Sequence, residues 1–176
     1  MQNVLSNTAH ETLHSLAKDY AAYNLWAVNQ MVNWLRTHPQ DMMDTAVLSS
    51  FKGIRQTITH IMNTQDWWQG VLQHHADDSL YGREHTGSME ELYNDIIAHS
   101  QEFAAYVDAL TEEELNEIVP FSIPYVGDFK APRYQMIQHA VTHGTYHRGQ
   151  VVTIAHHLDI HDAPMTDYMF YVLMAK

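Results

Sequence analysis

The 176-residue sequence contains no cysteine, which excludes disulfides, thiolate nucleophiles and thiolate metal ligands. Any bound metal must therefore use nitrogen or oxygen donors. Basic residues are also few, since 9 Lys and Arg stand against 21 Asp and Glu, for a formal net charge of −12. This charge opposes binding to phosphate backbones and anionic lipid surfaces, so we expect neither nucleic acid nor a membrane as partner.

Long apolar runs are absent as well. No stretch approaches the roughly eighteen consecutive apolar residues of a membrane-spanning helix, and the first twenty residues lack a basic start followed by an apolar segment. We therefore expect a soluble, cytoplasmic protein. Hydrophobic residues make up 45% of the chain, with 4 Trp and 10 Tyr, which suffices for the core of a single domain over residues 1–176.

Apolar residues recur at spacings of three or four in four long segments, which predicts four helices. Thr37-His38-Pro39 ends the first helix, because proline disfavours helical geometry at the residue before it. Ser49 or Ser50 can cap the second helix, Ser88-Met-Glu-Glu91 forms a capping box for the third, and Pro132 can begin the fourth. The predicted helices cover residues 8–36, 51–74, 88–110 and 133–158.

Shorter elements connect these helices. Thr111 to Glu114 repeats the capping pattern and predicts a short helix. Residues 118–132 hold three prolines and several β-favouring side chains, which indicates an extended loop or small hairpin. Residues 165–174 form a last apolar helical segment that we expect to cover the bundle. The predicted fold class is all-α, a four-helix bundle with a loop or hairpin before its fourth helix and a short C-terminal helix.

Histidine is abundant, with 14 residues, and the segment His139-Ala-Val-Thr-His-Gly-Thr-Tyr-His-Arg-Gly-Gln150 is the most informative stretch. His143 and His147 are four residues apart and share one helix face, where two imidazoles can converge on one metal ion. His60 lies inside the apolar second helix. Together they make a three-histidine site with an open position, as in catalytic zinc centres. His139 shares the stripe of His143 and could replace His147 as a ligand.

Other readings of these histidines stay open at this point. Pairs four apart recur at His10 with His14 and at His157 with His161, so spacing alone is a weak signal. An interior histidine such as His60 is more often a hydrogen-bonded core residue than a ligand. If the site exists, imidazole donors select a transition metal. That ion would lower the pKa of bound water to about 7, or polarise a substrate oxygen or sulfur.

Residues near the histidines carry weaker hypotheses. Arg148 could bind an anionic substrate, or it could point outward and form ion pairs with acidic side chains. Trp67 could line a pocket or pack in the core. Asn63 and Asp66 could accept a hydrogen bond from a ligand imidazole. No catalytic general base is assigned. Packing or cross-helix roles are expected for three further residues, namely Gly144, Gly149 and Gln150.

Three segments resemble the DinB family of damage-inducible proteins, within the DinB/YfiT-like superfamily and distinct from the DNA polymerase of the same name. They are Tyr20–Asn29, Ser50–Ile61 and Thr142–Gln150. The resemblance implies a four-helix bundle that binds a divalent metal, zinc or nickel, through one histidine of the second helix and two of the fourth. By position these are His60, His143 and His147, so the resemblance favours His147 over His139.

The resemblance also suggests reactions. The superfamily includes thiol-dependent transferases and isomerases that use low-molecular-weight thiols such as bacillithiol or mycothiol. A metal would then bind the thiol of a cosubstrate as thiolate, which attacks a small electrophile in detoxification or stress response. Two alternatives remain, namely metal-dependent hydrolysis and a non-catalytic interaction protein in which the metal staples the second helix to the fourth. The resemblance further suggests a homodimer formed through an exposed apolar helix face.

Overall fold

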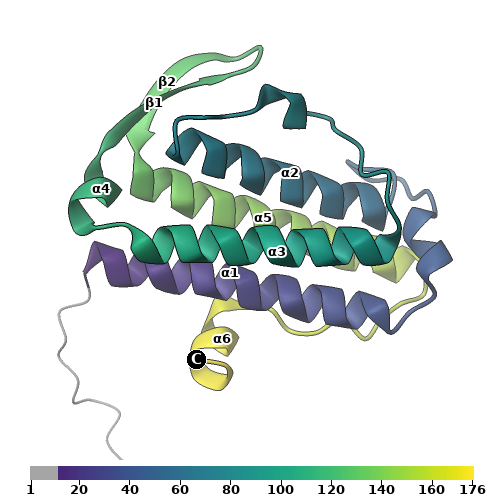
Figure 1. The fold of residues 1–176 in the computed structure, drawn as a ribbon. Coiled ribbons are helices and arrows are strands. Elements are labelled where there is room, and N and C mark those ends of the chain that lie inside the picture. The colour runs from purple at the N-terminus through teal and green to yellow at the C-terminus, as the bar shows by residue number, and fades with distance from the viewer. Residues whose placement is uncertain (1–11) are drawn as a thin grey trace, which may run out of the picture.

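Four long helices form a bundle in the computed structural model, which describes residues 12–176 (Figure 1). Helices α1 and α2 each contact both α3 and α5, so the four helices enclose one interior. This arrangement confirms the predicted all-α bundle. The helices are α1 (Leu13–Arg36), α2 (Ile54–Leu72), α3 (Met89–Ala109) and α5 (Arg133–His157).

Two of the helix starts follow from side-chain caps. Thr12 is the N-cap of α1, and its hydroxyl accepts a hydrogen bond from the backbone N–H of Ser15 at 3.2 Å. The predicted residues 8–11 of this helix lie outside the described part of the chain. At α3, the Ser88 hydroxyl accepts from the Glu91 N–H at 3.2 Å, and the Glu91 carboxylate accepts from the Ser88 N–H at 2.7 Å. The predicted capping box at this helix is confirmed.

The start of α2 differs from the prediction. The helix begins at Ile54 with Gly53 as N-cap, and neither Ser49 nor Ser50 caps it. A Cβ at Gly53 would lie 3.1 Å from the carbonyl oxygen of Thr45, in the chain that follows the short 3-10 helix η1 (Gln40–Asp44), so the close approach requires glycine. Phe51 consequently precedes the helix. At the other end α2 stops at Leu72, and His74 adopts a left-handed φ of 61° that breaks the predicted extension.

The connection between α3 and α5 contains a short helix and a hairpin, as predicted. Helix α4 (Glu112–Asn116) is followed by antiparallel strands β1 (Ile118–Ile123) and β2 (Gly127–Pro132). A second 3-10 helix, η2 (Asp78–Leu80), lies in the loop after α2. The terminal helix α6 (Tyr168–Met174) packs on α1 through Tyr171 but leaves several apolar side chains exposed, so it covers only part of the bundle. Within the described residues, no helix has the length and apolar character needed to span a membrane.

A polar layer divides the apolar core of the bundle into two clusters. One cluster contains Ala21, Trp67 and Phe103, and the other contains Val32, Ile58 and Tyr93. Near the boundary between the two clusters lie buried polar side chains, one from each of the four long helices. They are Asn24, Gln65, Ser100 and Arg148.

Hydrogen bonds join the members of this polar layer. Arg148 Nη1 donates to Asn24 Oδ1 at 2.8 Å, and Asn24 Nδ2 donates to Gln65 Oε1 at 2.7 Å. Ser100 Oγ lies 3.4 Å from the same Gln65 oxygen. A Cβ at Gly144 would lie 3.2 Å from both Arg148 Nη1 and Asn24 Oδ1, so a glycine here leaves room for the bond between α5 and α1. The layer fixes the register of α5, the helix that carries the paired histidines, against α1 and α2.

Candidate metal centre

Three histidines from two helices converge beside the polar layer. His143 Nε2 lies 3.1 Å from His60 Nε2 and 3.1 Å from His147 Nε2, and one nitrogen of each ring lies within 4.8 Å of the others. Nitrogens bound to one tetrahedral ion at 2.0–2.1 Å would be about 3.4 Å apart. The spacing therefore fits a shared metal ion, and two of the donors come from the helix spacing i and i+4.

The protonation pattern of His147 also suits metal binding. Its Nδ1 lies 2.7 Å from Gln150 Oε1, an oxygen that can only accept, so Nδ1 carries the hydrogen and Nε2 keeps its lone pair. Gln150 Nε2 in turn lies 3.4 Å from Ser50 Oγ, which supports this orientation of the amide. Gln150 therefore orients one donor of the site toward the other two.

The surroundings keep the imidazoles neutral at physiological pH. Burial, reinforced by the neighbouring His147, lowers the pKa of His60 to about 4. Burial and the other histidines lower the pKa of His143 to about 3. Burial also lowers the pKa of His147, against the opposing effect of its bond to Gln150. Neutral rings offer lone pairs, so the site is ready to accept a cation.

Aromatic rings enclose the cluster on one side. The Phe51 ring lies 4.5 Å from the His60 ring and 5.6 Å from the His147 ring, between ring centroids. The Tyr146 ring lies 4.9 Å from that of His147. Across residues 12–176, no carboxylate joins the three-histidine group. A metal held here would keep at least one coordination position for a water or a substrate.

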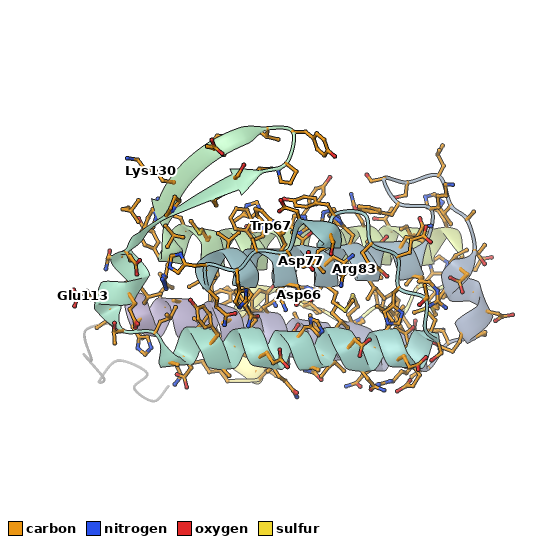
Figure 2. The ribbon with its side chains drawn as sticks, turned by 45° about the horizontal axis from the view of Figure 1, so that its top comes forward. Asp66, Trp67, Asp77, Arg83, Glu113 and Lys130 are labelled. Carbon is orange, nitrogen blue, oxygen red and sulfur yellow. The ribbon has the colours of Figure 1, made fainter. Side chains whose placement is uncertain are left out.

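A cavity of about 460 Å³ lies against His60. It follows one face of α2 and is closed by the loop that contains η2 and Arg83 (Figure 2). Its walls are mixed, with aromatic, hydroxyl, amide and charged side chains. A volume of this size accommodates a small organic molecule next to the candidate metal position.

Comparison with known proteins agrees with this geometry. A model of the DinB family matches residues 6–175, nearly the whole chain. The chain belongs to the DinB family. The DinB-family relative named "Protein DinB", from Bacillus subtilis (strain 168), is 26% identical over 161 residues, which cover 88% of this chain and 92% of that protein. The family resemblance seen in the sequence is thus confirmed.

The other described histidines of this DinB-family chain are not part of the cluster. His139 packs its ring against Trp68 at 4.9 Å, and its centroid is 5.9 Å from that of His143. It is not part of the three-histidine group. His14 lies 3.2 Å from the backbone oxygen of Asp108, while His10 lies outside the described residues. The structure thus brings together His60, His143 and His147 rather than the set with His139.

The weaker candidates take varied positions. Arg148 is buried against α1, where it belongs to the polar layer, and it does not line the cavity beside His60. Asn63 and Trp67 do line that cavity; Asn63 Nδ2 donates to the Arg83 carbonyl at 2.8 Å and Trp67 Nε1 donates to Asp78 at 3.0 Å. Asp66 pairs with His99 of α3 instead of supporting a cluster histidine.

Two residues of the site make contacts that the sequence did not predict. Phe51 was assigned to the second helix, but it precedes α2 and stacks on His60. Gln150 was expected to bond across helices or to the backbone, whereas its main partner is His147, three residues away on the same helix. The spacing i and i+3 between a histidine and an amide was the available signal for Gln150.

Proposed function

We propose that this chain is a cytoplasmic metal-dependent enzyme that attaches a low-molecular-weight thiol, through its sulfur, to a small electrophile, in detoxification or stress response. One observation carries the proposal. Three neutral imidazole nitrogens meet at one point without a described carboxylate, beside a cavity large enough for a small molecule. A purely structural ion would instead be closed by a fourth protein ligand.

The chain's own residues would hold and shape this centre. His60, His143 and His147 supply the donors, Gln150 holds the His147 ring, and Phe51 shields one side from water. When bound, zinc or nickel supplies a Lewis acid that lowers the pKa of a coordinated thiol. In the transfer, a carbon–sulfur bond forms, the leaving group departs with its electron pair, and the thiol proton passes to solvent. No cysteine of the protein is needed.

The cavity wall favours thiol transfer over hydrolysis. Hydrolysis commonly uses a side chain to take and return a proton. Among the described residues of the cavity the only carboxylate is the exposed Glu84, on the loop after η2, and the one histidine besides His60 is His85, whose Nε2 is held by Asp95. A thiol that has already lost its proton attacks without such a group, so the proposed reaction needs no proton-accepting side chain in the cavity wall.

An activity assay tests the proposal. Purified protein, loaded with one equivalent of zinc or nickel, would be mixed with bacillithiol or mycothiol and monobromobimane, with fluorescence reporting the thioether product. We expect turnover above the metal-free rate, abolished in His143→Ala and retained in His157→Ala, which alters an exposed histidine of the same helix. Metal-independent rates, or equal rates in both variants, would refute thiol transfer at this centre, and ester hydrolysis under the same conditions would establish the alternative.

We also propose that the chain forms a homodimer. The exposed apolar side chains of α6 support this, because a surface of this kind is commonly covered by association. They include Met169, Phe170, Leu173 and Met174. Light scattering of the purified protein gives the oligomeric mass directly, and a monomer at micromolar concentration would refute the proposal.

A further inference from the structure

The cavity beside His60 changes character along α2. Near the start of the helix its wall carries Lys52, Arg55 and Gln56, and near the end it carries Trp67 with Leu80 and Tyr81 from the loop. His60 lies between the two ends. At a rise of 1.5 Å per residue, Gln56 and Trp67 are about 17 Å apart along the helix axis, with His60 about 6 Å from the first and about 10 Å from the second.

The end of the cavity near the start of α2, called here the polar end, contains charged and polar groups that lack partners. Lys52 is the one basic side chain of this wall without an acidic partner among the described residues, since Arg55 pairs with Asp44 and Arg83 with Asp77. Lys52 also directly precedes the N-terminus of α2, where the helix dipole favours negative charge.

Two buried polar atoms on the same stretch of wall also lack protein partners. Thr59 is 6% exposed and its hydroxyl has no hydrogen-bond partner. His85 Nδ1 is likewise buried without one, although His85 Nε2 lies 2.9 Å from Asp95. Buried polar atoms in native proteins normally have partners, so unpartnered ones on a cavity wall point to a ligand. An anionic group near Lys52 could accept from the Thr59 hydroxyl and lie beside His85.

The apolar end is built from flat rings. The Trp67 and Tyr81 rings are 5.3 Å apart in an edge-to-face arrangement, and the Trp67 indole N–H is held by Asp78. Figure 2 shows Trp67 next to Asp77 and Arg83, away from Lys130 of the hairpin. Arg83 pairs with Asp77 at 2.9 Å and Asp78 adds a further negative charge, so this end disfavours an anionic group and offers apolar ring surface instead.

We propose that this cavity binds the electrophilic substrate as an elongated amphipathic anion. Its aromatic or aliphatic body lies against the rings of Trp67 and Tyr81, and its carboxylate or similar group lies near Lys52 and Thr59. The reacting carbon lies at His60, between the two ends of the cavity. The catalytic meaning of this arrangement rests on the proposed thiol transfer, but the binding of the anion does not.

A matched pair of probes tests the inference on metal-free protein. The probes are 6-phenylhexanoate and its neutral amide, 6-phenylhexanamide, titrated at physiological salt while the indole N–H signals of the four tryptophans are followed by NMR. The Trp67 signal is identified by its loss in Trp67→Phe. We expect saturable shifts of the Trp67 signal, with the carboxylate bound about three- to fivefold more tightly than the amide. Equal affinity for the two probes, or shifts confined to the other tryptophans, would overturn the inference.

Charge variants localise the effect. Lys52→Glu should remove the advantage of the carboxylate and leave binding of the amide unchanged, while Lys130→Glu, on β2 outside the cavity, should change neither. Equal losses in both variants would show a general charge effect and contradict an anion site at Lys52. If the protein binds the carboxylate but no metal, the proposed function is refuted and this inference stands. If the protein is active in thiol transfer but binds neither probe, this inference is refuted and the proposed function stands.

Discussion

Alanine substitution at two glycines of α5 should have opposite effects on stability. An exposed helical Gly→Ala change normally stabilises a protein by about 0.5–1 kcal/mol, because glycine loses more backbone entropy on folding. Gly149 is exposed and a Cβ there meets nothing within 4 Å, so Gly149→Ala should give this gain. Gly144→Ala places a Cβ 3.2 Å from Arg148 Nη1 and from Asn24 Oδ1, and must displace one of them.

The displacement weakens a buried bond to a charged group, at a cost of about 1.5–3 kcal/mol. The net change for Gly144→Ala is therefore a loss of about 0.5–2.5 kcal/mol, and the two variants should differ by about 1.5–3 kcal/mol. Urea denaturation of the metal-free proteins, followed by circular dichroism, measures this difference, which corresponds to roughly 3–12 °C in Tm for a chain of this size. Equal stabilisation by both substitutions would refute the argument that Gly144 makes room for the polar layer.

Further perturbations address the site and its surroundings. Gln150→Ala should lower metal affinity about ten- to a hundredfold by releasing the His147 ring, measured by competition with a chromophoric chelator; an unchanged affinity would contradict this role. The hydrogen bond that His99 donates to Asp66 raises the pKa of His99, so the pair stabilises the fold below pH 6.5 and this contribution fades as the pH rises through the raised pKa. The stability lost in His99→Gln should accordingly shrink from pH 6 to pH 9, and a constant loss would argue against the linkage. The lowered pKa of His143 gives the opposite pH dependence, because unfolding of the metal-free protein takes up a proton at this residue at low pH. Stability should therefore fall as the pH drops from 6.5 toward 3. His143→Leu should flatten this dependence in acid denaturation curves. Leu173→Glu on α6 should turn a dimer into a monomer by light scattering, and a dimer that survives would place the interface elsewhere.

The sequence predicted the helices well because their signals are local. Apolar spacing marked the four long helices, and the Ser88 capping box marked the start of α3 correctly. The prediction from sequence was wrong at the start of α2, where Ser49 and Ser50 are more favourable N-cap residues than Gly53. The deciding contact there, with the carbonyl of Thr45, comes from chain eight residues earlier. Contacts of this kind leave no local pattern.

The candidate site was predictable in outline for the same reason. His143 and His147 share a helix face, so their pairing followed from spacing. The choice of His147 over His139 came from the family resemblance, because spacing alone does not show where α2 crosses α5. Arg148 was the least predictable residue. Its neighbours on α5 gave no hint that its partner is Asn24, 124 positions away. The polar layer therefore emerges only from the packed bundle.

Metal stoichiometry with its coordination spectrum tests the central claim most directly. Metal-free protein would be titrated with Co²⁺, whose visible absorption is strong in tetrahedral sites, and then with Zn²⁺, with bound metal counted by elemental analysis. We predict one equivalent with a tetrahedral spectrum, displaced by Zn²⁺ and lost in each of His60→Ala, His143→Ala and His147→Ala, but retained in His139→Ala. Absence of binding in the parent protein, or binding that survives all three substitutions, would contradict a metal centre at these histidines.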